Sequence, residues 1–355
     1  MISSRSIIAI PPGATIKEQL NDRGMSQKEF AARMDMSEKH ISRLINGEVQ
    51  LTPDMAVRLE TVLGVPARFW SNLEAAYREK IAKAKAENSL EKDTEIAARF
   101  PYGEMSRLGW VPQTNSSKER AANLRKYFEV AELDLLEDSR ITNIACRRLA
   151  ITEKSDLALI AWAQEAKIIA RDIETWPVNI KGLKYSVPYI REMTAEAPED
   201  FFPELEKILA EHGIALVVLP HLKGSFLHGA TFIDGKKIVT GLTARGRDAD
   251  KFWFSLFHEL GHITLGHIGL TGGTTDEDEK KADAWAADAL IDPGKFKIFT
   301  ETGDFSRQSV IEFAAKQRIA PGIVVGRLQR ERMIKYNVLN DLKEKYVISI
   351  TEKKS

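Results

Sequence analysis

The sequence has almost no cysteine, no net charge and no long apolar run. A single cysteine, Cys146, stands among 355 residues, which excludes an intramolecular disulfide framework and a metal site built from several cysteines. Lys and Arg together number 51, as do Asp and Glu, so no global field draws the chain toward nucleic acid or an anionic membrane. Any metal must therefore be held by histidine and carboxylate, and any nucleic-acid binding must come from a local surface.

Long apolar stretches are also absent. No segment resembles a secretory leader, and none approaches the roughly 18 uncharged apolar residues that cross a bilayer. We therefore expect a cytoplasmic protein without membrane contact. With 43% hydrophobic and 29% charged residues, the chain has the composition of a globular protein with room for two or three domains.

Periodicity and composition divide the chain into five parts. The first predicts five short helices, the second is a charged linker, and the third is a helical connector. The fourth predicts an α+β unit with a small antiparallel sheet, in which "IALVVLP" and the two halves of "HGATFIDGKKIVTGL" are strands. We therefore expect a multidomain protein with an all-α N-terminal domain and an α+β C-terminal domain. The five parts are 1–81, 82–115, 116–195, 196–300 and, for C-terminal helices and tail, 301–355.

Two short helices capped by serine are predicted in "MSQKEFAARMDMSEKHISRLINGE". Ser26 and Ser37 can each cap a helix, and the turn of about four residues between the helices suits a helix-turn-helix. In that motif the second helix enters the major groove, while the N-terminus of the first meets phosphate. The predicted DNA-binding residues are Gln27, Lys28, Glu38, Lys39, Ser42 and Arg43.

The stretch from Pro12 to about Tyr77 continues with "LTPDMAVRLETVLGVPARFWSNLEA" and resembles the HigA-type branch of the Xre/Cro helix-turn-helix family. The resemblance implies a domain that binds a double-stranded DNA operator. Residues 26–47 hold four basic and three acidic side chains, a balance of only +1. Because this is little charge for strong binding by one copy, we expect a homodimer presenting two recognition helices. A five-helix protein-binding module would show a similar pattern.

The segment "DKFWFSLFHELGHITLGH" raises the question of a metal site. On a helix, His258 and His262 lie one turn apart on the same side and can reach a single ion. Glu259 projects toward the open side of the metal, where it can accept a proton from water. This is the HExxH pattern of metalloproteases, although a buried packing helix can also carry histidines. His267 lies about 140° around the helix from His262, which favours a helix-end residue over a ligand.

A third ligand is available in "TTDEDEKKADAWAADALIDP", which predicts a second helix. Glu279 would complete a His-His-Glu set and leave a fourth position open, as catalytic zinc requires. Asp283, one turn on, can orient a ligand imidazole through its other nitrogen. Glu277 is a rival ligand, but its i+4 neighbour is Lys281, a poor partner for a ligand histidine. Glu279 could instead belong to a solvated helix N-terminus.

The segments "LTARGRDADKFWFSLFHELGHITLGH" and "EKKADAWAADALIDP" resemble the ImmA/IrrE family of zinc-dependent endopeptidases, and the likeness extends over roughly residues 120–335. The resemblance implies a gluzincin-like fold, a zinc ion held by His258, His262 and Glu279, and catalysis by Glu259. Mn²⁺ is the alternative metal, because availability decides between the two. The family also implies a protein substrate, an Xre-type repressor, which here is a partner protein or the chain itself.

Two side chains are candidates for stabilising the oxyanion or binding substrate. His228 stands in a predicted strand, where it can equally be a surface residue, and Arg245 precedes the HExxH helix, where it can instead pair with nearby aspartates. Together the two resemblances imply a regulator that cuts a repressor in a stress, toxin–antitoxin or mobile-element response. The alternative is a HigA-like antitoxin or transcription factor whose peptidase fold senses or docks without cutting.

Overall fold

A computed structural model describes most of the chain and divides it into two compact units. The first unit comprises the residues up to Ile96 together with Ser116–Ala122, and the second comprises Ala97–Asn115 and the residues from Asn123 onward. Cys146 and Arg245 lie outside the described residues. No helix among those residues combines the length and the apolar character needed to cross a membrane. The described residues are 4, 6–137, 153–223, 228–243, 248–268 and 274–346.

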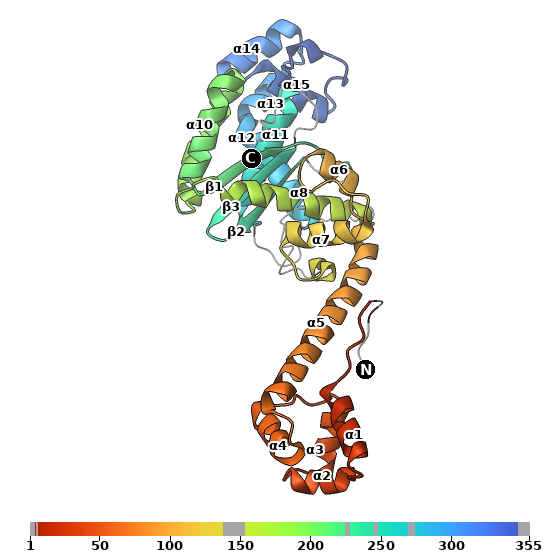
Figure 1. The fold of residues 1–355 in the computed structure, drawn as a ribbon. Helices are drawn as coiled ribbons and strands as arrows, with labels where there is room; N and C mark the ends of the chain where they lie inside the picture. Colours follow the sequence, from red (N-terminus) through yellow and green to blue (C-terminus); the bar gives the residue numbers. More distant parts are fainter. Residues whose placement is uncertain are drawn as a thin grey trace. The chain divides into compact units, whose positions relative to one another are not determined.

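The first unit is a set of helices around one small core (Figure 1). Phe30, Ile41, Leu59 and Trp70 have no exposed surface, and they come from four different helices. Helix packing is close where Gly13 meets Ile45, because a Cβ on Gly13 would lie only 2.0 Å from the Ile45 carbonyl oxygen. The helices are α1 (Pro12–Asp22), α2 (Gln27–Arg33), α3 (Glu38–Ile45), α4 (Pro53–Leu63) and α5 (Ala67–Ala97).

Helix α5 extends into the range 82–115 that the sequence predicted as a linker. It continues for 31 residues, and a further helix, α6 (Tyr102–Arg107), follows Pro101. The segment between Ala67 and Phe100 contains no glycine or proline and is rich in alanine, glutamate and lysine, which are strong helix formers. The charge of this segment therefore lies on a helix surface.

The rest of the chain adds helices and three strands. The range predicted as a helical connector contains the helices α7, α8 and α9. The elements are α7 (Ser117–Phe128), α8 (Glu153–Arg171), α9 (Ile180–Glu192), α10 (Pro198–Glu211), β1 (Ile214–Leu219), β2 (Gly229–Asp234), β3 (Lys237–Thr243), α11 (Ala249–Leu265), α12 (Asp276–Leu290), α13 (Pro293–Glu301), α14 (Arg307–Gln317) and α15 (Pro321–Arg330).

The sheet is mixed, so the prediction of an antiparallel sheet was wrong. Its strand order is β1-β3-β2. β2 and β3 form the predicted antiparallel hairpin, with Asp234 opposite Lys237, whereas β1 runs parallel to β3. β1 is apolar and almost entirely buried, which is typical of a parallel strand covered on both faces. The uninterrupted apolar sequence of β1 therefore agrees with its parallel pairing.

The two faces of the sheet contact different helices. Side chains alternate along a strand, and Ile238 and Leu242 of β3 join the core that contains α11. Gly241 faces the other way, where the ring of Trp162 from α8 lies so close that a Cβ would come within 2.6 Å of it. Figure 1 shows α8 crossing the sheet, which it contacts at β1 and β3. The helix that we predicted as connector therefore covers one face of the sheet.

The C-terminal helices belong to the same core as the sheet. Val310 of α14 and Val324 of α15 are fully buried in it. Tyr346, which follows α15 in the chain, accepts a hydrogen bond at its hydroxyl from Trp253 Nε1 of α11 at 2.8 Å. The ranges predicted as connector, peptidase domain and C-terminal tail thus contribute to one unit, because their apolar faces share a single core.

Candidate metal centre and nucleic-acid interface

Helices α11 and α12 pack closely because small residues face one another. Ala282 and Ala286 have no exposed surface, and a Cβ on Gly261 would meet the Ala282 carbonyl oxygen at 3.2 Å. α11 ends at Gly266, which adopts a left-handed conformation with φ of 78°. Thr275 begins α12 with a capping box. The two helices therefore bring the histidines of one within reach of the carboxylates of the other.

Three predicted ligands converge on one point. His258 Nε2 and His262 Nε2 are 3.0 Å apart. Glu279 lies 3.3 Å from His258 Nε2 through Oε2 and 3.5 Å from His262 Nε2 through Oε1. Among the described residues, these three form the group of histidine, cysteine and carboxylate side chains that could hold a metal ion. The rival residue, Glu277, instead pairs with Lys281 at 2.8 Å.

The donor atoms lie close enough together to contact one ion. One ligand atom from each of the three side chains lies within 4.8 Å of the other two, and the two Nε2 atoms are 3.0 Å apart, whereas ligand atoms about 2.0–2.1 Å from a tetrahedral ion lie about 3.3–3.4 Å from each other. His258 Nδ1 faces a carboxylate and His262 Nδ1 faces another ring, which leaves each Nε2 toward the shared point. Two imidazoles and one carboxylate are also a ligand set that zinc favours.

The local charges favour a cation at this point. Burial opposes a positive charge on His258, but hydrogen bonds to Asp283 and Glu279 outweigh burial and raise the pKa of His258 to about 10. Burial and the neighbouring charge of His258 lower the pKa of His262. A partly buried ring held positive by surrounding carboxylates indicates a negative potential, which is the potential that attracts a metal ion.

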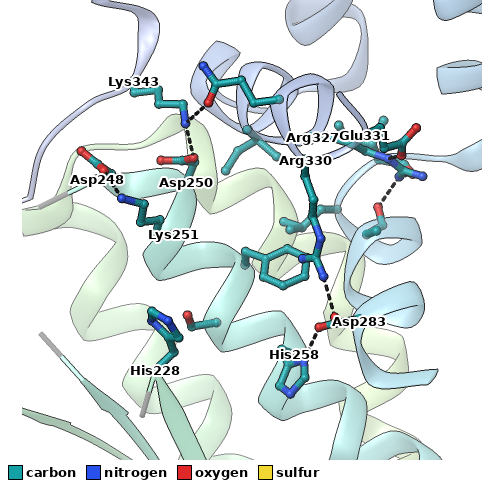
Figure 2. Close-up of a pocket in the computed structure, with 18 of the residues that line it drawn as sticks. His228, Asp248, Asp250, Lys251, His258, Asp283, Arg327, Arg330, Glu331 and Lys343 are labelled. Atoms are coloured by element: carbon teal, nitrogen blue, oxygen red, sulfur yellow. Dashed lines mark hydrogen bonds and ion pairs between the residues drawn. The ribbon is translucent and has the colours of Figure 1, made fainter. Parts of the chain in front are cut away.

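Asp283 contacts the Nδ1 side of the His258 ring, and Arg330 in turn contacts Asp283. Asp283 Oδ1 contacts His258 Nδ1 at 2.8 Å, and Asp283 Oδ2 accepts a hydrogen bond from Arg330 Nη2 at 2.5 Å (Figure 2). The guanidinium of Arg330 also lies over the Phe254 ring, 4.0 Å from its centroid. α15 therefore holds the carboxylate that contacts a predicted ligand histidine, an arrangement that resembles the outer shell of many metal sites.

Glu259 is buried next to the ligands and held by the sheet. Its side chain is 4% exposed, and Oε2 accepts a hydrogen bond from the Thr231 hydroxyl of β2 at 2.7 Å. Gly229 leaves room for this carboxyl, since a Cβ there would lie 2.6 Å from Oε1. Burial raises the pKa of Glu259 to about 7, although His258 and Thr231 partly counteract it. Such a group can both accept and return a proton near neutral pH.

A cavity of about 1230 Å³ contains the three predicted ligands and Glu259. It continues along α11 to Asp250, whose carboxylate pairs with Lys343 at 2.7 Å (Figure 2). The exposed side chain of His228 also lines it. The cavity can therefore hold an extended ligand, and His228 belongs to its lining. The other oxyanion candidate, Arg245, lies outside the described residues.

The helix-turn-helix segment forms in the first unit as two short helices. The Ser26 hydroxyl accepts a hydrogen bond from Glu29 N at 3.1 Å, and Ser37 accepts one from His40 N at 3.2 Å. Phe30 and Ile41 face the core, which turns the polar residues outward. Five of the six predicted DNA-binding residues are exposed, and the sixth, Ser42, is half-buried. The five exposed residues are Gln27, Lys28, Glu38, Lys39 and Arg43.

Comparison with known proteins places this unit in a family. Residues 16–70 match the helix-turn-helix family profile. An uncharacterized HTH-type transcriptional regulator of Escherichia coli (strain K12), YddM, is 36% identical over 80 residues, which cover 22% of this chain and 81% of that protein. The chain belongs to the helix-turn-helix transcriptional regulators. Virulence-associated protein I of Dichelobacter nodosus is 32% identical over 76 residues, which cover 21% of this chain and 70% of that protein.

In this helix-turn-helix regulator, the N-terminal domain thus carries the DNA-binding function that its residues predicted. Sequence reasoning missed four residues around the predicted ligands: Thr231, which holds Glu259, Arg330, which holds Asp283, His267, which contacts His262, and Thr274, which donates to Glu279 Oε1 at 2.5 Å. His267 offered a signal, because it stood in the HExxH segment itself. The other three are ordinary residues of a strand, a helix and a loop.

Proposed function

We propose that this transcriptional regulator carries a zinc-dependent metallo-endopeptidase in its second unit. The observation that supports the proposal is the convergence of His258, His262 and Glu279 beside a buried glutamate. A purely structural metal site has no need of Glu259, whereas hydrolysis requires a base at this place. The likeness of the HExxH segment to the ImmA/IrrE peptidases agrees with this reading.

His258, His262 and Glu279 would hold the ion in this proposal. A zinc ion supplies Lewis acidity, which makes water nucleophilic near neutral pH and polarises a peptide carbonyl. Glu259 removes a proton from the attacking water as its oxygen bonds to the carbonyl carbon. Glu259 then gives that proton to the amine nitrogen as the carbon–nitrogen bond breaks. Thr231 keeps the Glu259 carboxyl in one orientation through its hydrogen bond at 2.7 Å.

The substrate we propose is a repressor-type protein, either a partner or the chain itself. The DNA-binding unit would bring the peptidase to a double-stranded operator, and cleavage would then change expression of the genes controlled there. We also propose that the regulator binds its operator as a homodimer, because the recognition segment carries a charge balance of only +1 and paired recognition helices are the usual arrangement.

Cleavage by purified protein tests this proposal. The zinc-loaded protein is incubated alone and with the repressor-type protein encoded beside its gene, and the products are followed by mass spectrometry. We expect cleavage of one of the two, and a rate at least about 10³-fold lower for Glu259→Gln because the proton acceptor is lost. The Glu259→Gln variant should retain its zinc, since Glu259 is not in the ligand set.

The alternative function gives a different result. A HigA-like regulator with a sensing or docking module would bind zinc and its partner without cutting either, and Glu259→Gln would complement the wild type fully in cells. That combination would overturn the peptidase proposal and leave the DNA-binding function intact.

A further inference from the structure

The end of helix α11 folds back onto a metal ligand. Gly266 has φ of 78°, and the His267 backbone N–H donates to the His262 carbonyl oxygen at 2.9 Å. This bond from residue 267 to residue 262 is characteristic of a Schellman helix end. Because the chain reverses at Gly266, His267 does not continue around the helix. Its side chain returns to His262 and is only 7% exposed.

The two rings contact each other on the side away from the other ligands. His262 Nδ1 and His267 Nδ1 are 3.1 Å apart, whereas His262 Nε2 faces His258 and Glu279. His267 is therefore not part of the ligand set. His267 contacts His262 Nδ1, which is the ring nitrogen left when Nε2 binds an ion. Asp283 contacts Nδ1 of His258 in the same way.

We infer that His267 is a positioning residue, which accepts a hydrogen bond from His262 Nδ1 and so directs His262 Nε2 toward the metal; this inference rests on the proposed zinc site. A hydrogen bond between two ring nitrogens requires one donor and one acceptor. When His262 Nε2 binds an ion, the proton of that ring is on Nδ1, so His267 Nδ1 is the acceptor. The proton of His267 then lies on Nε2.

Asp278 fixes the far side of the His267 ring. Its Oδ1 lies 3.6 Å from His267 Nε2, where a negative charge favours an N–H group. Asp278 Oδ2 meanwhile accepts hydrogen bonds from the backbone and the hydroxyl of Thr275, the residue that begins α12. One aspartate therefore caps the helix that carries Glu279 and holds the ring that orients His262. His267 thereby connects the adjoining ends of the two ligand helices.

Zinc affinity measures this role without any cleavage assay. Affinity is determined by competition with a chromophoric chelator for the full chain and for three variants. We expect His267→Leu to lose about 10- to 100-fold in zinc affinity, as for other residues that orient ligands. His267→Asn should regain most of that affinity, because its amide oxygen can occupy the place of Nδ1 as an acceptor. His212→Leu is the matched control, since His212 contacts Ser186 in the same unit and should leave affinity unchanged.

The tautomer gives a second readout that does not depend on folding of a variant. Long-range ¹H–¹⁵N spectra of the zinc-loaded wild type, labelled at histidine, should show His267 with its proton on Nε2 and a bare Nδ1. A proton on His267 Nδ1, or equal zinc affinity for wild type and a folded His267→Leu variant, would overturn the inference. Failure of the wild type itself to bind zinc would instead refute the proposed function.

Discussion

The two units of this regulator differ in how their functional residues are assembled. In the first unit, the six predicted DNA-binding residues lie on two consecutive short helices, α2 and α3. In the second unit, the residues of the proposed metal site come from β2, α11, α12 and α15. A contiguous surface can be recognised in a sequence pattern. Where packing assembles a site from distant segments, a sequence pattern reveals only the residues that share one helix.

The units also differ in burial, which determines how strongly single side chains act. Arg43 is 51% exposed and lies 3.5 Å from Glu48, a surface pair that contributes little to folding stability and leaves Arg43 free to bind DNA. The His262 side chain, by contrast, is 3% exposed, so its orientation depends on neighbouring groups. Substitutions in the first unit should therefore change DNA recognition, and substitutions in the second should change metal affinity.

The larger effect is expected at Arg43 in the recognition helix. Arg43→Ala should weaken binding to the preferred DNA by about 1–3 kcal/mol, or roughly 5- to 160-fold, and should relax base preference, because one base contact is lost. The measurement selects preferred sequences from a random duplex pool with wild type and variant, and then titrates the selected DNA. Zinc affinity should not change.

Lys297→Ala provides a control of equal charge change, since Lys297 is 77% exposed on α13 in the other unit. It should leave DNA selection as in the wild type. If Arg43→Ala selects the same sequences as the wild type with the same affinity, Arg43 does not read bases, and the assignment of α3 as recognition helix loses its main support.

A smaller effect is expected at Arg330. Arg330→Gln removes the ion pair that holds Asp283, but Asp283 retains its contact with His258. Zinc affinity should therefore fall by only about tenfold, at the low end for groups that orient ligands. Chelator competition measures this change, and DNA binding by the same sample should equal that of the wild type. Unchanged zinc affinity would show that Asp283 is held without α15.

The sequence predicted much of the site because helix geometry fixes local relations. His258 and His262 had to share one side of α11, and Glu279 and Asp283 had to share one side of α12. The structure brings all four together. His267 was predicted to be a helix-end residue because its angle from His262, about 140° around the helix axis, was calculated for a helix that continues to residue 267. The left-handed turn at Gly266 ends that helix, so the angle did not apply.

The fold was predicted less completely where distant segments decide it. The hairpin of β2 and β3 is encoded by its own turn, but the parallel partner of β1 depends on tertiary pairing. Thr231 and Arg330 likewise gain their roles only when β2 and α15 pack beside the ligand helices. The length of α5 could have been predicted, since nothing between Ala67 and Phe100 breaks a helix.

Zinc content tests the central claim about the second unit most directly. After dialysis against zinc and gel filtration, elemental analysis should find one zinc ion per chain in the wild type and in Glu259→Gln. Glu279→Ala, which removes a ligand, should lose zinc under the same conditions while its far-UV circular dichroism remains that of the wild type. A wild-type protein without bound zinc, or a Glu279→Ala variant that retains one zinc per chain, would contradict the account.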